Sequence, residues 1–404
     1  MRCKINGISI FIDFDRFYEI EEFDDITEID CSYCNEKEFK KFPKGLIKLN
    51  CSYSKIRYLK NLPYGIKKIN CSHADIDELD DLPNTLKELN CSVCSIDKLD
   101  NLPNKLKKLT CQENGIKSLD KLPKSLKILK CKKNKIRYLE NLPKSLIEID
   151  CSENRIEKID VNLMEQLVKL NCKNNRLTSI ENLPISLIEL NCSKNEITEL
   201  NNKIICKESN FASLKIIDCS LNKINLIHFL PNSILDIDCS NNLLDEINDL
   251  PISLKKLDCS HNSIKNINHL PETLETLFCH KNEITTLKYL PKNLNTLYCL
   301  LDNYENIPDS LKFLDGRNYS STFYKDFIDG KRSMESIIEK LNIQTNISNK
   351  IECLICHQLE HTIFLPCNHS YCMKCFINWY YVNNNIKICC YCNLPFIPED
   401  CIFR

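Results

Sequence analysis

Apolar residues recur along this chain with a period of twenty residues. A representative unit, residues 102–121, reads LPNKLKKLTCQENGIKSLDK, and its leucines and cysteine return in the same places in the neighbouring units. Leu109 and Cys111 flank Thr110, so the local alternation predicts a short strand that turns both apolar side chains inward and Thr110 outward. The cysteine slot is filled at positions 31, 51, 71, 91, 111, 131, 151, 172, 192, 219, 239, 259, 279 and 299.

The rest of each period predicts how the chain returns from one strand to the next. Twenty residues leave no room for a true helix, and a proline near the start of most units favours an extended, polyproline-like back side. Stacked units of this kind form a solenoid of parallel strands. Residues 8–14 alternate like a strand and are expected to cap the open end of the core. Insertions at 161–166 and 203–212 are expected to bulge from the back or the rims.

In nine units an asparagine follows the cysteine by three positions, and its amide is expected to bond backbone groups at the turn after the strand. Some earlier units hold cysteine in this slot instead, which creates the pairs Cys31/Cys34 and Cys91/Cys94. These pairs have the spacing of half a zinc site, yet the first cysteine of each belongs to the repeat. We therefore predict packing rather than metal binding, because a free cysteine behaves as a small buried hydrophobe.

These units resemble leucine-rich repeats with cysteine in the third leucine slot. Their Leu-Pro start is similar to the short LPX class of bacterial effector ubiquitin ligases, although nothing in the chain matches the catalytic cysteine domain of those enzymes. The resemblance covers residues 26–318 and implies a horseshoe of short parallel strands with a concave binding face. The predicted fold class is thus a β-rich solenoid with an extended back side, to which a small zinc-binding cross-brace domain is appended.

The outward residue of each strand should line the concave face. Consecutive units place three aspartates and then two aromatic residues there, namely Asp218, Asp238, Asp258, Phe278 and Tyr298. We predict that these five bind a protein substrate, the alternative being a solvated face without a partner. Residues 105–137 hold twelve basic and two acidic residues, a net of 12 − 2 = +10, but interleaved aromatic residues are missing and nucleic acid is disfavoured.

A second group of cysteines, near the end of the sequence, does not follow the twenty-residue period. Its members come in pairs with metal-ligand spacing, and eight such ligands bind two zinc ions. The candidate ligands are Cys353, Cys356, Cys367, His369, Cys372, Cys375, Cys389 and Cys392. Cys390 is excluded, because only one residue separates it from Cys392.

The order of these ligands resembles that of a RING finger, whereas a PHD finger would place its histidine fifth rather than fourth. The resemblance implies two structural zinc ions and a domain that holds a ubiquitin-conjugating enzyme with its ubiquitin ready for attack by a substrate lysine. It also implies that Ile355 and Trp379 contact this enzyme, with core packing as the rival role for Trp379. Cys390 stands where proline is usual, and Asn393 stands where active RING domains often carry Arg or Lys. Both departures bear on the strength of catalysis.

Composition narrows the choice of partners and compartment. The chain has 404 residues, a formal net charge of -1 and 27 cysteines. The near-zero charge argues against bulk attraction to nucleic acid or to an anionic membrane. A signal peptide and an apolar run of the roughly 20 residues that a membrane span needs are both missing, so we expect a cytoplasmic protein. An odd cysteine count in a reducing compartment favours buried thiols and metal ligands over disulfides.

The sequence therefore divides into a cap (1–25), the repeat solenoid (26–318), a linker with a short helix at 333–343 (319–350) and a RING-type zinc finger (351–404). The expected function is that of a RING-type ubiquitin-protein ligase whose solenoid binds the substrate. The alternative is a non-catalytic scaffold whose RING mediates assembly.

Overall fold

The computed structural model describes residues 1–200, 213–228, 230–267, 269–287, 289–299, 308, 310–314 and 317–318, and beyond these only the short strands between 344 and 403. The chain divides into two compact units, a first unit Met1–Leu254 and a second unit Lys255–Arg404. Among the described residues, no helix is long and apolar enough to cross a membrane.

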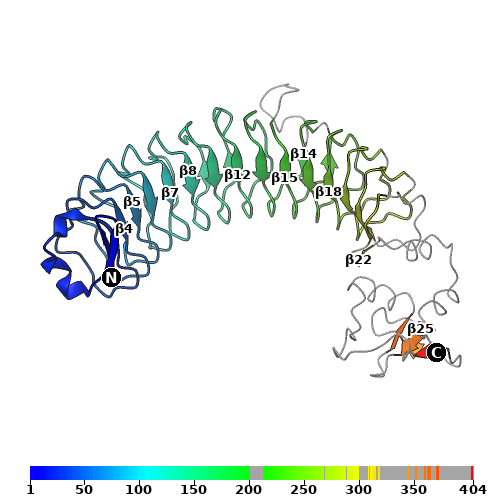
Figure 1. The fold of residues 1–404 in the computed structure, drawn as a ribbon. Coiled ribbons are helices and arrows are strands. Elements are labelled where there is room, and N and C mark those ends of the chain that lie inside the picture. Colours follow the sequence, from blue (N-terminus) through cyan, green and yellow to red (C-terminus); the bar gives the residue numbers. More distant parts are fainter. Residues whose placement is uncertain are drawn as a thin grey trace. The chain divides into compact units, whose positions relative to one another are not determined.

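The first unit is a solenoid. Its successive turns contribute short parallel strands that lie side by side in one layer (Figure 1). In most strands a buried middle residue stands between less buried neighbours, as Leu109 does between Lys108 and Thr110. Successive strands pair in register, so equivalent residues of neighbouring turns lie opposite each other; Asn50, for example, lies opposite Asn70. The strands are β3 (Ile26–Asp30), β4 (Lys48–Asn50), β5 (Lys68–Asn70), β6 (Glu88–Asn90), β7 (Lys108–Thr110), β8 (Ile128–Lys130), β10 (Glu148–Asp150), β12 (Lys169–Asn171), β13 (Glu189–Asn191), β15 (Ile216–Asp218) and β17 (Asp236–Asp238).

A hairpin and two 3-10 helices cover the N-terminal end of this solenoid. β1 (Arg2–Ile5) lies between β2 (Ile8–Phe11) and β3, antiparallel to both. η1 (Phe14–Glu19) and η2 (Phe23–Asp25) follow. The expected capping strand is present but ends at Phe11, because the chain then turns into η1 to bury the ring of Phe17 in the core.

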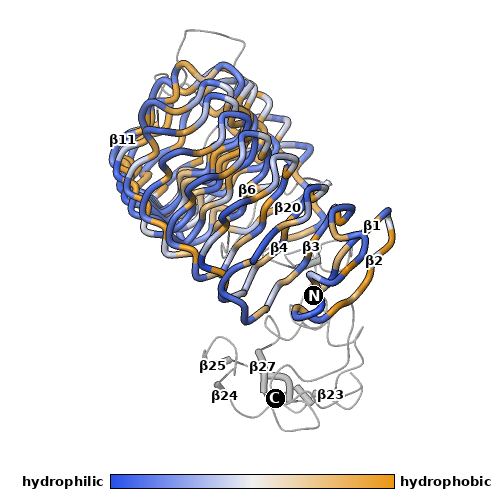
Figure 2. Tube along the Cα trace, turned by 90° about the vertical axis from the view of Figure 1, so that its left-hand side faces the viewer, coloured by the Kyte–Doolittle hydropathy of each residue, from blue (hydrophilic) through white to orange (hydrophobic). Residues whose placement is uncertain are grey.

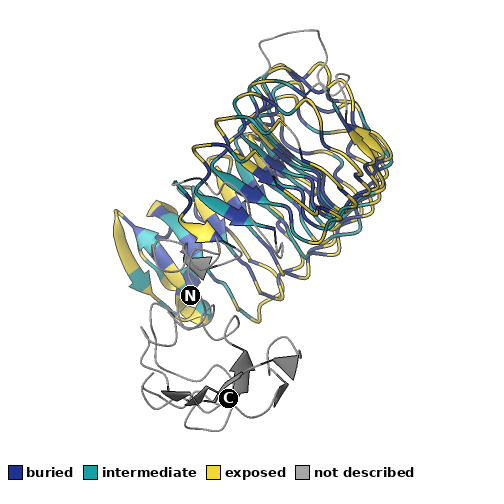
Figure 3. Cartoon of the chain, turned by 90° about the vertical axis from the view of Figure 1, so that its right-hand side faces the viewer, coloured by how far each residue is buried: buried dark blue, intermediate teal, exposed yellow. Residues whose placement is uncertain are grey.

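The interior of the first unit is filled by columns of leucine, isoleucine and cysteine, and the asparagine column lies at the turn after the strands. Figure 3 shows the buried and half-buried segments of the strands. Each turn repeats the same order of hydrophobic and hydrophilic residues, so residues of one kind line up along successive turns (Figure 2). Nδ2 of Asn134 donates to the carbonyl oxygens of Cys111 and Cys131 at 2.9 and 3.0 Å, and its Oδ1 accepts from the N–H of Ile116 at 3.1 Å. One amide thus joins two turns, and the predicted role of the asparagine column is confirmed.

The back of the first unit combines turns with short strand pairs. The carbonyl oxygen of Pro103 accepts from the N–H of Leu106 at 3.0 Å, and other units repeat this turn at their prolines. β9 (Tyr138–Leu139) pairs with β11 (Lys158–Ile159), and β14 (Glu199–Leu200) with β16 (Leu226–Ile227), both in parallel. The back is therefore not uniformly polyproline-like, because extended segments of successive turns come close enough to exchange backbone hydrogen bonds.

The insertion at 161–166 does not bulge as expected. Val161 and Met164 are both buried in the core. The carbonyl oxygen of Met164 accepts from the N–H of Leu167 at 3.0 Å, which is the turn that proline begins in other units. The second insertion, 203–212, lies outside the described residues.

Within the second unit, β18 (Lys256–Asp258), β19 (Thr276–Phe278), β20 (Thr296–Tyr298) and β21 (Phe313–Leu314) pair in parallel, and β22 (Arg317–Asn318) is antiparallel to β21. Its later strands are β23 (Gln344–Thr345), β24 (Ile351–Glu352), β25 (Leu359–Glu360), β26 (Thr362–Phe364), β27 (Ser370–Cys372) and β28 (Ile402–Phe403). β24 pairs with β25, and β26 with both β27 and β28, all antiparallel; β23 pairs with β28 in parallel. The expected linker helix falls outside the described residues.

Candidate functional site

The outward face of the sheet in the first unit carries one column of polar residues, the last residue of each strand. From Asp30 to Asp238 every member of this column is half-buried. We call the outward face of these parallel strands the sheet face. Because the strands pair in register, its side chains stand at strand spacing, about 4.8 Å apart.

Two of the predicted substrate-binding residues, Asp218 and Asp238, are neighbours on this face. Oδ1 of Asp218 accepts from the N–H and hydroxyl of Ser220 at 3.1 and 2.6 Å, and its Oδ2 accepts from Nδ2 of Asn191 at 2.8 Å. Asp238 accepts the same pair of bonds from Ser240 at 3.0 and 2.7 Å. The carboxylates therefore receive donors from the solenoid itself, from the serine of the same turn and, for Asp218, also from the preceding turn.

The other three predicted residues belong to the second unit, where Asp258 lies opposite Phe278 and Phe278 opposite Tyr298. Asp258 accepts from the N–H and hydroxyl of Ser260 at 3.0 and 2.6 Å. The rings of Phe278 and Tyr298 meet edge to face at 6.4 Å, and the ring of His280 lies 4.3 Å from that of Tyr298. Sequence reasoning missed this histidine, although it directly follows the cysteine of its unit.

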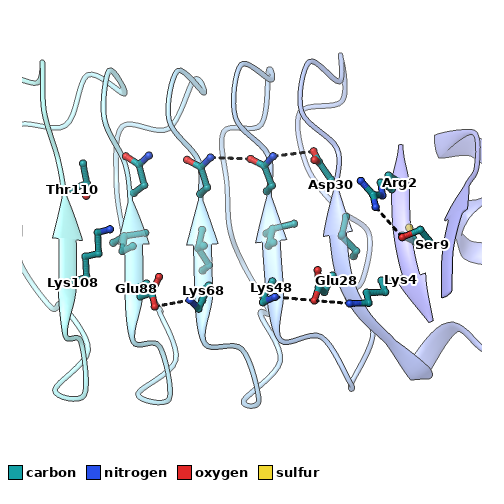
Figure 4. A pocket seen from close by; sticks show the side chains of 18 residues that line it. Arg2, Lys4, Ser9, Glu28, Asp30, Lys48, Lys68, Glu88, Lys108 and Thr110 are labelled. Atoms are coloured by element: carbon teal, nitrogen blue, oxygen red, sulfur yellow. Dashed lines mark hydrogen bonds and ion pairs between the residues drawn. The ribbon is translucent and has the colours of Figure 1, made fainter. Parts of the chain in front are cut away.

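A groove of about 530 Å³ lies on the sheet face over β1 to β7, entirely within the first unit (Figure 4). Glu28 pairs with Lys4 at 3.5 Å and with Lys48 at 2.9 Å, and Lys68 pairs with Glu88 at 2.6 Å. The hydrogen bond from Lys48 lowers the pKa of Glu28. Sequence reasoning missed this groove. A charged residue begins each of the strands β4 to β7, and this recurrence could have predicted a charged groove.

An amide ladder runs along the upper edge of the same groove in Figure 4. Nδ2 of Asn70 donates to Oδ1 of Asn50, and Nδ2 of Asn50 donates to Oδ1 of Asp30, both at 3.0 Å. Burial raises the pKa of Asp30, but the hydrogen bonds from Ser32 and Asn50 outweigh this effect and the pKa lies below its usual value. The ladder orients the amides of Asn50 and Asn70 in the same direction, so this edge of the groove is an ordered polar surface.

Exposed aromatic residues stack at the turns that follow the first strands. Tyr33 lies parallel to Tyr53 at 5.1 Å, and Tyr53 to His73 at 4.1 Å. All three residues have positive φ, between 54° and 61°. Sequence reasoning missed this stack, although the three residues occupy one slot of the twenty-residue period, two positions after the cysteine.

The two cysteine pairs that imitate a zinc site are packed as expected. Cys31, Cys91 and Cys94 are buried, and among the described residues no group of His, Cys, Asp or Glu could hold a metal ion. The Sγ of Cys94 lies 3.0 Å from the carbonyl oxygen of Cys71. Cys34 alone of the four is half-buried.

The exposure of Cys34 leads to a prediction about its reactivity. The neighbouring thiol of Cys31 lowers the pKa of Cys34 to about 7, with help from the N–H of Glu36. Because the thiolate is the nucleophile, iodoacetamide should modify Cys34 first among the described cysteines of the repeat, and the rate should rise through about pH 7. Peptide mapping by mass spectrometry measures the modification of each cysteine.

Cys94 is the matched control for this experiment. The thiol of Cys71 lowers the pKa of Cys94 in the same way, but Cys94 is only 2% exposed. Its modification should be slow in the folded protein. Equal rates at the two positions, or a Cys34 rate that rises only near pH 9, would contradict the prediction.

The candidate zinc ligands lie in the second unit, mostly outside the described residues. Cys353, Cys356, Cys367, His369, Cys375, Cys389 and Cys392 are outside them, as are the predicted enzyme contacts Ile355 and Trp379. Cys372 is the last residue of β27, where only the backbone is described.

Comparison with known proteins identifies the fold. No family model and no curated protein matches the chain. Among solved structures, YopM from Yersinia enterocolitica is 27% identical, covering 71% of this chain and 72% of that chain with a TM-score of 0.55. YopM from Yersinia pestis, a leucine-rich effector protein, is 26% identical, with coverages of 71% and 87% and a TM-score of 0.57. The functional domain of InlJ from Listeria monocytogenes, which includes a cysteine ladder, is 26% identical, with coverages of 69% and 68% and a TM-score of 0.51.

These likenesses agree with the parallel strands and the buried cysteine column described above. The chain contains a leucine-rich-repeat solenoid similar to these domains. Such a solenoid is a protein-interaction domain, and its extended sheet face is the surface that such arrays use for binding.

Proposed function

We propose that this chain is a RING-type ubiquitin-protein ligase, in which the repeat solenoid binds a protein substrate and residues 351–404 recruit a ubiquitin-conjugating enzyme. The observation that carries the proposal is the spacing of eight cysteine and histidine residues outside the repeat period. Seven thiols and one imidazole are a donor set suited to two structural zinc ions.

Two features of the described residues support this assignment. The paired strands β24 and β25 flank Cys353 and Cys356 in the sequence, and the paired strands β26 and β27 flank Cys367 and His369. Four of the eight candidate ligands thus lie, in the sequence, between the strands of two antiparallel pairs. In addition, the cysteines of the repeat are free and almost all buried, so they do not compete for the metal.

In the proposed mechanism the protein supplies position rather than covalent chemistry. As the RING resemblance implies, Cys353, Cys356, Cys372 and Cys375 would hold one zinc ion, and Cys367, His369, Cys389 and Cys392 the other. The ions stabilise the folded domain when bound. Ile355 and Trp379 would contact the conjugating enzyme, and the solenoid would bring a substrate lysine close to the activated ubiquitin, which raises the rate by proximity.

Zinc analysis of the full-length chain tests the ligand assignment. Elemental analysis should find two zinc ions per chain, as eight ligands require. Replacing the proposed ligand in Cys389→Ser should lower the zinc content. The neighbouring substitution Cys390→Ser is the matched control and should leave the zinc content unchanged, and equal loss in both variants would refute the assignment.

Ubiquitin transfer tests the activity separately. With a panel of conjugating enzymes, the zinc-loaded protein should modify itself, and Ile355→Ala should abolish this activity without loss of zinc. A zinc-loaded protein that is inactive with every enzyme would instead favour a scaffold whose RING mediates assembly. Asn393 is the residue that favours this second function, since it stands where active RING domains often carry Arg or Lys.

A further inference from the structure

Four lysines occupy the same slot of four consecutive turns in the first unit. Lys67, Lys87, Lys107 and Lys127 each directly precede a strand, from β5 to β8, and all four are exposed. The backbone N–H of Lys87, Lys107 and Lys127 donates to the carbonyl oxygen of the lysine one turn before it, at 2.8 Å in each case. We call these four residues the lysine row. Their Cα atoms are therefore stacked at strand spacing, about 4.8 Å.

The lysine row is a bounded patch. The same slot holds Ile47 in the turn before the row and Ile147 in the turn after it. The backbone ladder is continuous through both positions, since Lys67 donates to Ile47 at 2.9 Å and Ile147 to Lys127 at 2.8 Å. The backbone is therefore the same from Ile47 to Ile147, and only the side chains change from apolar to basic and back.

No carboxylate among the described residues forms an ion pair with a member of the row. Elsewhere in the first unit, lysines pair with glutamates of the adjacent turn, as in Lys48–Glu28 at 2.9 Å, Lys68–Glu88 at 2.6 Å and Lys130–Glu148 at 3.1 Å. Such pairing is the ordinary way to balance charge across strands. The lysine row does not follow this pattern. Its four positive charges lie side by side, and no described carboxylate forms an ion pair with any of them.

One further lysine extends the unbalanced charge into the groove. Lys108 follows Lys107 directly, lines the groove beside Glu88, and forms no ion pair with any described residue. Figure 4 shows it next to Thr110 at the end of the groove that is farthest from Arg2. The row therefore borders the groove at β7, where the exposed Lys107 directly precedes the groove residue Lys108 and the two add positive charge.

We propose that the lysine row, together with Lys108, binds an acidic segment of the protein partner. Charge complementarity argues for an anion, because like charges at strand spacing repel one another unless an opposite charge is brought to them. A protein segment fits better than single-stranded nucleic acid, since strands β5 to β8 (KIN, ELN, KLT and ILK) present no aromatic ring on which a base could stack. This inference rests on the role of the solenoid in substrate binding and specifies the substrate as one with an acidic region.

Binding of a fluorescent peptide that alternates glutamate and serine, measured by anisotropy with the full-length protein, tests the proposal. The quadruple variant Lys67→Gln, Lys87→Gln, Lys107→Gln, Lys127→Gln should lose affinity at least about tenfold at low salt, and added salt should weaken the native complex. The control variant Lys132→Gln, Lys133→Gln, Lys169→Gln, Lys223→Gln removes the same charge from lysines that pair with glutamates. It should bind as the native protein does.

Three outcomes would overturn the proposal: no binding of the acidic peptide, equal loss in both variants, or tighter row-dependent binding of a single-stranded RNA of matched charge. Thermal unfolding of the variants, followed by circular dichroism, separates lost binding from lost folding. Self-ubiquitination is measured on the native protein, so the test of the ligase proposal does not depend on the row variant. Failure of peptide binding and failure of the ligase proposal are thus read in different assays.

Discussion

Raising the pH from 8 to about 10 is expected to unfold the repeat array cooperatively. Burial raises the pKa of the thiols in the cysteine column, because the charged thiolate is disfavoured in the apolar core. The pKa of Cys111, for example, is raised from 9.0 to about 12. Eight cysteines share this cause, namely Cys51, Cys91, Cys111, Cys131, Cys151, Cys172, Cys192 and Cys219.

The direction of this effect follows from proton linkage. The folded protein keeps these protons, whereas the unfolded chain releases them above pH 9, so the stability is fully present below pH 9 and is lost as the pH rises. Each pH unit above 9 removes about 1.4 kcal/mol per thiol. Eight thiols therefore remove on the order of 11 kcal/mol by pH 10, which is comparable to the total stability of about 5–15 kcal/mol that folded proteins have.

Urea unfolding at a series of pH values, followed by far-ultraviolet circular dichroism in the presence of a reducing agent, measures the effect. The triple variant Cys111→Ala, Cys131→Ala, Cys151→Ala is the control. It should be less stable at pH 7 because it leaves cavities, but its unfolding free energy should fall less steeply with pH. Equal slopes in the two proteins would show that other groups, such as tyrosines or lysines, cause the alkaline unfolding.

Asn134→Ala is expected to destabilise the array by roughly 2–4 kcal/mol. The Asn134 side chain is only 8% exposed and serves the backbone of two turns. Alanine would leave the N–H of Ile116 without its partner, and the carbonyl oxygens of Cys111 and Cys131 would each lose one of the two amide donors they have. Each buried backbone group that loses its hydrogen bond costs about 1–3 kcal/mol, and water entering at the turn would recover part of this loss.

The matched control is Asn104→Ala, which removes the same amide from an exposed position. Asn104 makes no side-chain hydrogen bond to any described residue, and its replacement should change the urea midpoint little, since surface substitutions usually stay within about 0.5 kcal/mol. Both variants are compared by the midpoint of urea unfolding. Similar shifts at the two positions would mean that the asparagine column does not hold the turns together.

The twenty-residue period was enough to predict the strands, their parallel order and the two interior columns. Strand alternation is a local property, so the inward position of Cys111 beside the outward Thr110 follows from their neighbours in sequence. The same reasoning separated the packed pair Cys91/Cys94 from a metal site. The period did not predict the place of the 161–166 insertion, because Val161 and Met164 join the core through contacts with adjacent turns.

The predicted binding residues show where local reasoning ended. The sequence placed Asp218 and Asp238 on the outward face, and they lie there, half-buried. Their bonds to Ser220 and Ser240 are local, because each serine follows its aspartate by two residues. The bond from Asn191 to Asp218 joins two turns and was decided by the tertiary structure. The predicted zinc ligands are defined by spacing alone and remain predictions.

The sequence by itself determined which side of each strand a residue occupies, because that direction depends only on the two-residue alternation and the regular period. Only the tertiary structure decided which charges have partners. Lys68 and Lys67 are adjacent in sequence and equally basic, yet Lys68 meets Glu88 of the next turn and Lys67 meets no carboxylate among the described residues. Charge pairing acts across turns that are twenty residues apart, over a few ångströms, and depends on side-chain positions that a linear pattern does not contain.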